Sequence, residues 1–325
     1  MKKRFLLLFL SLMLMISLAF GCGKDTVKEH KTIKFCYPDG IPALTVAKLI
    51  KENPVIDKST TIDYEMEKSP DLLVTKVLKE EADIAIVPSN LAAQAFNKDL
   101  SYKIAGTSIW GTLYLTSTED IEGFEELKGR EIYSFGKGLT PDLALRLILS
   151  ENGINPDEDV KITYLNAASE VGPAFLGGKT NLALLPEPLA TSVMMKKEDA
   201  RIILDLNKEW SNIIGTENGY PQASLIIKSD LIENDLEFVE NFIKTYKESM
   251  KWAKENPEDL GEYAEELELG IKKAAIVKGI ERINIGTFSI EDSKKEYETY
   301  YKSIMDFAPD FIGGKLPDET IYFER

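Results

Sequence analysis

The chain has 325 residues, enough for two domains of ordinary size, and 44% of them are hydrophobic and 29% charged. These values are typical of globular proteins and exclude a wholly disordered, collagen-like or polytopic membrane chain. The net charge of −15 disfavours nucleic acid as a partner, because an acidic surface repels phosphate. One His and two Cys leave no residues for a disulfide network, a Cys/His zinc site or a His-based triad.

Residues 1–21 have the pattern of an export signal. Three basic residues precede an apolar stretch over 5–20, which at about 1.5 Å per residue is too short for the ~30 Å hydrocarbon core. The small residue before Cys22 resembles a bacterial lipobox, which implies acylation of Cys22 and a membrane anchor; a plain secreted protein with a spare Cys is the alternative. Residues 22–31 are polar and predict a tether, and His30 within it has no partner ligands nearby for a metal site.

Strand patterns alternate with helix patterns from residue 32 onwards. Apolar stretches predict strands over 32–37, 61–66, 83–87, 103–107, 131–133, 160–164, 181–185, 201–204 and 223–227. Apolar residues at helical spacing predict helices over 42–51, 70–79, 89–96, 140–152, 167–176, 188–196 and 236–254, with Ser89 and Thr140 as N-caps. Cys36 falls in the first strand and is expected to be a buried thiol. The alternation predicts an α/β fold with parallel-rich sheets covered on both faces, followed by a helical C-terminal segment.

Four short motifs occur in the order that bacterial solute-binding proteins use. Residues 124–132 resemble the "dLkGkkI" entry to the second lobe, 136–141 a glycine turn before a helix, 177–184 the "aL..GkvDaa" pattern, and 186–188 the "(x)EP" turn. Asn181 stands where the family usually has Asp. The chain is thereby identified, by resemblance, as a member of the nitrate/sulfonate/taurine and thiamine-pyrimidine group of ABC-importer binding proteins. The turns at residues 37–40 and 87–90 fit the first lobe of that family.

The resemblance implies a two-lobed, periplasmic-binding-protein-like (type II, Venus-flytrap) fold. Lobe 1 is expected at 32–112 plus 226–325 and lobe 2 at 113–225, joined by two crossings that form a hinge, with a ligand held between the lobes. In open α/β sheets ligands bind beyond the carboxyl ends of strands. That rule gives these candidate ligand-binding residues: Tyr37, Asp39, Gly40, Ile41, Ser89, Asn90, Trp110, Gly111, Gly138, Thr140, Asn166, Glu187 and Tyr220.

The chemistry of these candidates bears on the ligand. They include aromatic side chains and the carboxylates Asp39 and Glu187, and Lys137 is the base nearby. Such a set favours a flat cationic or neutral heterocycle, so thiamine or an aminopyrimidine precursor is expected. An alkanesulfonate, taurine or nitrate-like anion, bound by helix N-termini, remains open, as does a ligand-binding surface sensor. Non-functional roles also remain open for some candidates. Tyr37 and Trp110 could serve only in packing, Thr140 could be a helix cap, and Glu187 could bond only to backbone amides of its own turn.

The resemblance also implies the remaining functional assignments. An ABC permease and its ATPase are the expected partners, the chain is expected to be a monomer, and it is placed on the extracytoplasmic face of the cell membrane. We predict no catalytic residue, no cofactor and no metal site. A thiamine-pyrimidine synthase with this fold consumes its own His and has a Cys-rich iron motif, whereas this chain lacks that motif and has its single His in the tether. We therefore expect a binding protein and not an enzyme.

Overall fold

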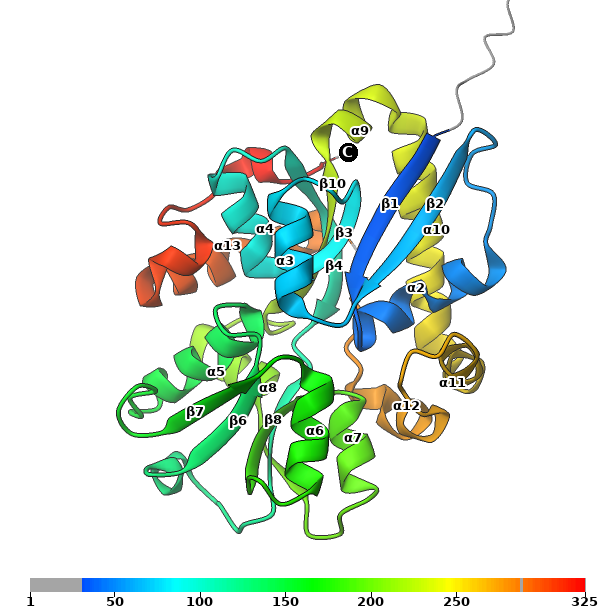
Figure 1. The fold of residues 1–325 in the computed structure, drawn as a ribbon. Helices are drawn as coiled ribbons and strands as arrows, with labels where there is room; N and C mark the ends of the chain where they lie inside the picture. The colour runs from blue at the N-terminus through cyan, green and yellow to red at the C-terminus, as the bar shows by residue number, and fades with distance from the viewer. Residues whose placement is uncertain (1–30, 287–288, 325) are drawn as a thin grey trace, which may run out of the picture. The chain divides into compact units, whose positions relative to one another are not determined.

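The computed structural model describes residues 31–286 and 289–324, in which two five-stranded sheets organise the chain (Figure 1). By internal contacts Thr32–Arg325 form one unit. Three predictions lie outside the described residues: the export signal over 1–21, the acylated Cys22, and the tether over 22–31 with His30. Lys31 is the one residue of that tether that the structure describes.

The first sheet joins four strands from the N-terminal part of the chain to one strand that returns much later. In spatial order its strands are β2 (Thr60–Glu67), β1 (Lys31–Pro38), β3 (Ile84–Pro88), β10 (Pro221–Lys228) and β4 (Tyr102–Trp110). Strands β1 and β3 are parallel, with Phe35 opposite Ile84, whereas β10 runs antiparallel to both of its neighbours. Parallel strands need long connections, which are supplied here by α2 (Ile41–Glu52), α3 (Pro70–Leu78) and α4 (Ser89–Asn97).

Helices cover both faces of this sheet because side chains alternate along each strand. One core cluster holds Phe35 and Ile86 with α2 and α10 (Leu236–Glu255), and the ring of Phe35 lies 5.4 Å from that of Phe242. The opposite cluster holds Val87 with α4 and α13 (Ile290–Phe307). Figure 1 shows α3 and α4 in front of the strands and α10 behind them. We call this sheet and its helices the first lobe.

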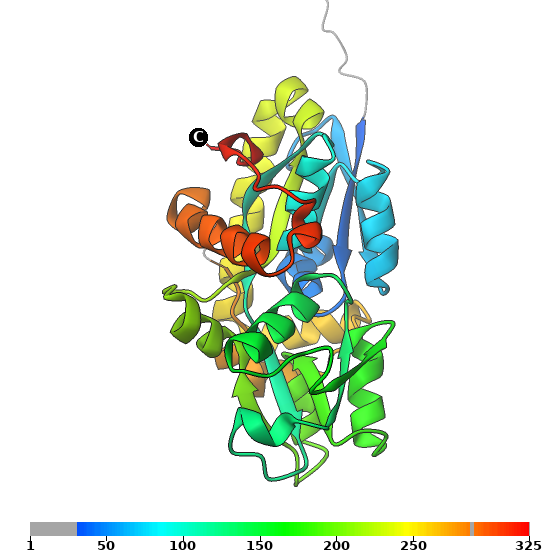
Figure 2. The same ribbon diagram turned by 90° about the vertical axis from the view of Figure 1, so that its left-hand side faces the viewer.

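The second sheet has the same number of strands. In spatial order these are β7 (Lys161–Leu165), β6 (Glu131–Phe135), β8 (Leu182–Pro186), β5 (Leu113–Ser117) and β9 (Arg201–Asp205). Strand β6 is parallel to β7 and β8, and β5 is antiparallel to β8 and β9. The helices of this second lobe are α5 (Thr140–Glu151), α6 (Ala168–Leu176), α7 (Leu189–Met194) and α8 (Leu206–Ile214) (Figure 2).

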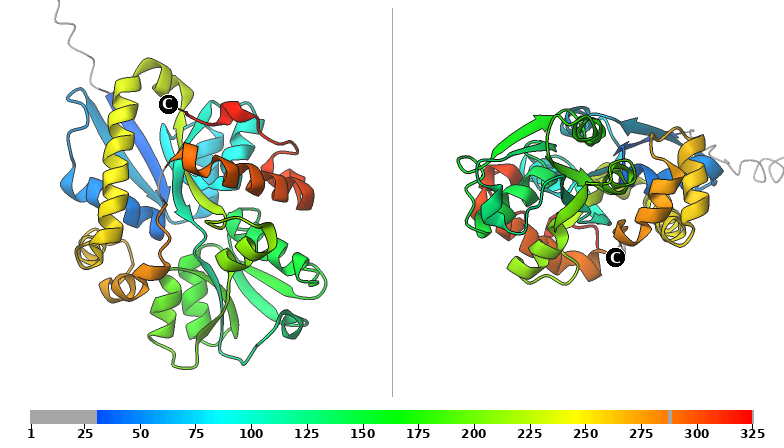
Figure 3. Two further views of the ribbon diagram at one scale, coloured as in Figure 1. Left: turned by 180° about the vertical axis from the view of Figure 1, so that it is seen from behind. Right: turned by 90° about the horizontal axis from the view of Figure 1, so that it is seen from below.

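The chain passes between the two sheets after β4 and again before β10 (Figure 3). Strand β10 begins at Pro221 and pairs with β4 from that residue onward, so the expected lobe boundary at 226 falls inside a strand of the first sheet. The apolar pattern began only at Ala223, which hid the start of the strand. The sequence patterns also predict no strand at β5 and no helix at α8, although Asp205 caps α8 by accepting from the backbone N–H of Asn207 and Lys208.

The rest of the chain is mainly helical, as the sequence predicts. Its elements are α9 (Ser229–Asn234), α11 (Pro257–Glu266), α12 (Lys273–Gly279) and the short 3₁₀ turns η2 (Ile280–Arg282), η3 (Pro309–Ile312) and η4 (Glu319–Ile321), while η1 (Phe124–Leu127) precedes β6. Within residues 31–286 and 289–324, we find no helix with the length and apolar character needed to cross a bilayer.

Two predicted N-caps are wrong. Ser89 is the first residue of α4, and its hydroxyl lies 2.7 Å from that of Ser224 in β10. Thr140 is the first residue of α5, and its hydroxyl contacts Asn90 and Tyr300. Neither side chain caps its own helix, because each hydroxyl has a partner on another element.

Candidate functional site

The predicted site residues lie where strands of both sheets end and helices begin. The helices α2, α4, α5 and α6 all start without a hydrogen bond from a capping side chain. Amides in the first turn of a helix carry its partial positive charge. Gly40, just before α2, has a φ of 85°, a conformation that favours glycine. Helix N-termini of both lobes therefore lie at the predicted site, and in α4 the Asn90 N–H donates to Thr140 Oγ1 at 3.4 Å.

Asn90 and Thr140 connect the two lobes directly. The Thr140 hydroxyl donates to Asn90 Oδ1 at 3.2 Å, and Asn90 Nδ2 donates to the carbonyl of Gly138 at 3.0 Å. Thr140 Oγ1 also lies 2.7 Å from the Tyr300 hydroxyl, which must be the donor because Thr140 has one hydroxyl proton. Three predicted residues are thus brought together, and they contact one another.

The turn at Gly138 is also held by the C-terminal segment. Asn90 Nδ2 donates a second hydrogen bond to the carbonyl of Phe311, at 3.0 Å. Gly138 has a φ of 76°, and a Cβ there would lie 3.1 Å from the Phe311 ring. Glycine is therefore favoured at 138 both by its backbone conformation and by the close approach of the ring. The sequence patterns did not identify Phe311, since no motif marks it.

Asp39 makes a second contact between the lobes. Its carboxyl lies near the side chain of Ser169 in α6 and near Lys68, and both groups act to lower its pKa. Burial raises the pKa of Asp39 to about 6, despite the opposing effects of Lys68 and Ser169. The structure thus places at the start of α2 a carboxyl group whose charge is incompletely compensated.

Glu187 makes a third contact and is fully buried. One carboxylate oxygen, Oε2, accepts from the backbone N–H of Thr191 at 3.1 Å, which satisfies a donor in the first turn of α7. The other, Oε1, accepts from the Thr191 hydroxyl at 2.9 Å and from Arg282 Nε at 2.5 Å. Both oxygens are thus used inside the chain. Arg282 was missed by the sequence reasoning because it lies in the helical C-terminal segment, outside every motif.

Tyr37, Ile41 and Ser89 are buried within the first lobe. The ring of Tyr37 lies 5.6 Å from that of Phe35 in an edge-on arrangement, and burial raises the pKa of the Tyr37 phenol above its usual value. Ser89 contacts Ser224, as described above. Each of these three residues therefore has a packing environment inside the lobe, which is the alternative that the sequence left open for Tyr37.

Trp110, Gly111 and Tyr220 lie at the two crossings between the lobes. The Gly111 N–H donates to the carbonyl of Tyr220 at 3.1 Å, and the Trp110 N–H donates to that of Asn284 at 2.9 Å. A Cβ on Gly111 would lie 2.7 Å from the Tyr220 ring and would also collide with Asn207. The two crossing segments are therefore in direct contact, and only glycine fits at position 111.

Tyr220 allows a first test of this hinge region. Its buried hydroxyl and the indole N–H of Trp210, whose ring centroid lies 5.2 Å away, have no hydrogen-bond partner among the described residues. We expect Tyr220→Phe to raise the free energy of unfolding by about 1 kcal/mol, because it removes an unsatisfied buried group. Urea unfolding measures this, with Tyr297→Phe as the control that loses stability, since the Tyr297 hydroxyl lies 2.6 Å from that of Ser224. A loss of stability in Tyr220→Phe would mean that its hydroxyl has a partner.

Asn166 lies apart from these contacts. It precedes α6 on an exposed surface, and its backbone N–H and Nδ2 both donate to the carboxylate of Glu170, at 3.2–3.3 Å. Glu170 thereby holds the start of α6, where the sequence placed only Asn166.

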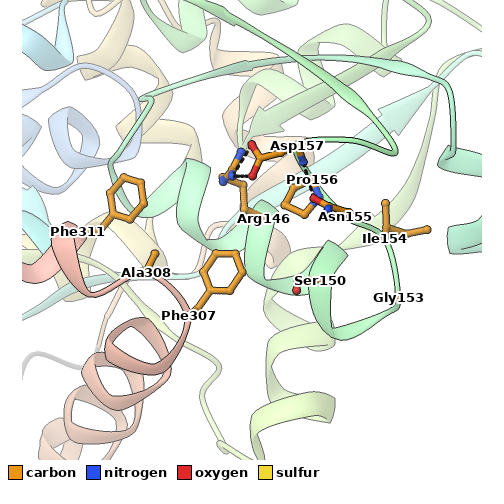
Figure 4. Close-up of a pocket in the computed structure, with 10 residues that line it drawn as sticks. All are labelled: Arg146, Ser150, Gly153, Ile154, Asn155, Pro156, Asp157, Phe307, Ala308 and Phe311. Atoms are coloured by element: carbon orange, nitrogen blue, oxygen red, sulfur yellow. Dashed lines mark hydrogen bonds and ion pairs between the residues drawn. The ribbon is translucent and has the colours of Figure 1, made fainter.

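A hollow of about 480 Å³ lies between the end of α5 and the end of α13 (Figure 4). It is lined by Arg146, Ser150, Gly153, Ile154, Asn155, Pro156, Asp157, Phe307, Ala308 and Phe311. Within it, Arg146 donates to both carboxylate oxygens of Asp157, at 2.7 and 2.8 Å. A second hollow, of about 560 Å³, shares Arg146 and adds Lys137 and Tyr164. Neither hollow is lined by the predicted ligand-binding residues.

The described residues contain no group of three or more His, Cys, Asp or Glu side chains placed to hold a metal ion. Cys36 is buried, and its thiol donates to Glu65 Oε2 at 3.6 Å. Burial and the nearby Glu65 charge raise the pKa of the Cys36 thiol to about 12, which keeps it protonated and unreactive.

Known proteins resemble this chain over most of its length. YtlA of Bacillus subtilis strain 168, to which a binding role is assigned provisionally, is 23% identical over 248 residues, covering 74% of this chain and 71% of YtlA. An ABC transporter structure from Parabacteroides distasonis is 29% identical with a TM-score of 0.75, covering 90% of this chain and 99% of that one. The periplasmic aliphatic sulphonate binding protein SsuA of Escherichia coli has a TM-score of 0.70 at 13% identity, covering 90% of this chain and 92% of SsuA.

The fold and the family are both established by these comparisons. The neighbours are type II periplasmic binding proteins, and they share the two-sheet α/β architecture described above. The NMT1/THI5-like family matches residues 59–260, which is more than half of the chain. Among the structural neighbours, SsuA is described as an aliphatic sulphonate binding protein and NrtA of Synechocystis PCC 6803 as a nitrate-binding protein. The chain therefore belongs to the NMT1/THI5-like family.

Proposed function

We propose that this protein is a lipid-anchored binding protein of an ABC importer that captures a small heteroaromatic metabolite, such as thiamine or an aminopyrimidine precursor, between its two lobes. It hands the ligand to a permease that is driven by an ATPase. The family match and the coverage of the solved binding proteins support the general role. The export signal and Cys22 in the sequence support an anchor on the extracytoplasmic face of the membrane. A monomer there is part of the proposal.

Asp39 is the observation that favours a cationic or hydrogen-donating heterocycle. Its half-buried carboxyl lies between the lobes, and desolvation raises its pKa to about 6 despite the opposing effects of Lys68 and Ser169. A ring with a positive charge or an amino group would supply the missing compensation. Glu187 is a weaker candidate for this role, because Arg282 already neutralises it.

A second ligand class is favoured by a different observation. The helices α2, α4, α5 and α6 begin at the lobe edges without side-chain caps, and such N-termini attract anions. A sulfonate, taurine or nitrate-like anion is therefore the alternative cargo. A ligand-binding surface sensor would use the same site, and the absence of permease and ATPase genes beside this gene would favour it.

A melting-temperature panel separates the ligand classes. Residues 32–325 are mixed with thiamine, aminopyrimidines, taurine, alkanesulfonates and nitrate, and binding is then measured by calorimetry. A ligand at 100 times its dissociation constant adds about 2.7 kcal/mol to the free energy of unfolding. We expect thiamine or a pyrimidine to raise the melting temperature. A response to anions alone contradicts the heterocycle and selects the second class.

The pH dependence of binding tests the role of Asp39. Its carboxyl is ionised above a pKa of about 6 and neutral below it, so a cation loses its partner as the pH falls through that value. We expect the affinity for thiamine to fall about tenfold between about pH 8 and about pH 5, and Asp39→Asn to weaken it about tenfold at the higher pH. In Asp39→Asn the pH dependence should disappear, while the exposed-site control Asp120→Asn should keep it. An anionic cargo would show the opposite sign, because it would bind better once Asp39 is neutral.

A further inference from the structure

Residues 273–286, which we call the strap, run from the first lobe past the second lobe and back. Helix α12, at the start of the strap, packs against α11 and against α7 of the second lobe, and Figure 3 shows it beside that lobe. At the other end, the Gly286 N–H donates to the carbonyl of Ser108 in β4 at 2.8 Å. Asn284 Nδ2 donates to the carbonyl of Gly111 at 2.7 Å. The strap is thus a third connection between the lobes, beside the two crossings.

Arg282, near the middle of the strap, contacts three groups of the second lobe. Its Nε donates to Glu187 Oε1 at 2.5 Å, and its guanidinium also donates to the Thr191 hydroxyl. Its carbonyl accepts from the Tyr114 hydroxyl at 3.3 Å. The Arg282 side chain is 36% exposed, whereas Glu187 is fully buried. Within the described residues, Glu187 forms its ion pair with Arg282. The buried negative charge of the second lobe is therefore neutralised by a residue of the strap.

The backbone of the strap also fits closely against α7. A Cβ at Gly279 would lie 3.0 Å from Thr191 Oγ1 and 3.2 Å from Glu187 Oε2. Those separations are tighter than ordinary van der Waals contacts, so a side chain at this position would push the strap away from the carboxylate. The contact between the strap and Glu187 therefore depends on two features: the missing side chain at Gly279, which allows the close approach, and the charge of Arg282, which forms the ion pair.

We infer that Arg282 is a positioning residue of the ligand site, which fastens the strap to Glu187 and holds the lobes together before the ligand arrives. The effect on affinity rests on the proposed function, because it assumes that the ligand binds between the lobes. When only a fraction of the protein is competent to bind, the apparent dissociation constant rises in inverse proportion to that fraction. Loss of the ion pair therefore weakens binding without removing any group that touches the ligand.

Small-angle X-ray scattering of ligand-free residues 32–325 tests the fastening directly. We expect Arg282→Gln and Glu187→Gln each to increase the radius of gyration, and the double variant to increase it no further, because both changes break one interaction. Arg201→Gln is the matched control, since Arg201 forms an exposed ion pair with Asp120 in the second lobe. A radius of gyration that stays at the wild-type value in Arg282→Gln, even with a lower melting temperature, overturns the inference.

Two further measurements keep the test independent of folding and of the ligand. Arg282→Lys keeps the positive charge but loses the fork-shaped contact, so we expect a smaller increase in the radius of gyration; it replaces Arg282→Gln if that variant does not fold.

With the best-binding compound of the panel, we expect Arg282→Gln to raise the dissociation constant about tenfold and excess compound to restore the radius of gyration. If the radius changes but no compound binds the wild type, the proposed function fails and the fastening stands. If compounds bind and the radius does not change, the fastening fails alone.

Discussion

Glu187→Ala should lower the free energy of unfolding by about 3 kcal/mol. The substitution leaves the half-buried Arg282 guanidinium without its counter-ion and removes the acceptor of the Thr191 N–H in α7. Breaking a buried ion pair by removing one partner costs about 3–5 kcal/mol, and the partial exposure of Arg282 places the expected loss at the low end of that range. Urea unfolding of residues 32–325 measures the change.

The matched control for this prediction is Asp120→Ala. Asp120 also pairs with an arginine, Arg201, but both side chains are largely exposed, so we expect a change below about 0.5 kcal/mol. If Glu187→Ala and Asp120→Ala have the same small effect, Glu187 is not the buried anchor that its contacts indicate.

Phe35→Ala should destabilise the protein by about 3–5 kcal/mol, the usual range for removing a fully buried phenylalanine. The ring lies in β1 at the centre of the core beneath α10, 5.4 Å from the ring of Phe242 and 6.2 Å from that of Tyr246. Its removal leaves a cavity that these rings cannot fill without moving off their rotamers. Chemical unfolding, with the change read from the midpoint at constant slope, measures the loss.

Leu72→Ala is the control for the core substitution. Leu72 is a large apolar residue of α3 that is 56% exposed, so its truncation should change stability by less than about 0.5 kcal/mol. A loss below about 1 kcal/mol in Phe35→Ala would mean that the first lobe tolerates repacking around β1, which contradicts the close ring contacts.

The alternation of apolar stretches was enough to predict the α/β class and most elements within a residue or two. Buried parallel strands have to be apolar throughout, and their crossover helices must have an apolar stripe, so both leave a local record in the sequence. Strand β5 escaped because its residues were interpreted as a crossing, and α8 escaped although its cap at Asp205 is a local signal. The start of β10 escaped because its pairing with β4, which is remote in sequence, extends it beyond the apolar run.

The candidate site was predicted less completely than the fold. The rule that ligands bind beyond strand ends placed Asp39, Asn90, Gly138, Thr140 and Glu187 at the edges of the two lobes, and the structure joins each of them to the other lobe or to the strap. It could not show that Asn90 and Thr140 contact each other, or that Glu187 is neutralised by a residue 95 positions away. It also placed Tyr37, Ile41 and Ser89 beside the ligand, where the structure gives them packing partners in the core.

Local features could be predicted from the sequence alone: the strands and helices of the two sheets, the motif order that resembles the family, and the acidic charge that disfavours nucleic acid. Hydrophobic periodicity and turn residues are signals between positions only a few residues apart, so they can be recognised in a single sequence without knowledge of the fold. Which charges and hydroxyls contact one another depends on how the chain packs in three dimensions. Arg282 reaches Glu187, and Phe311 reaches Gly138, because the C-terminal segment packs back across both lobes, and contacts between residues so distant in sequence leave no periodic signal.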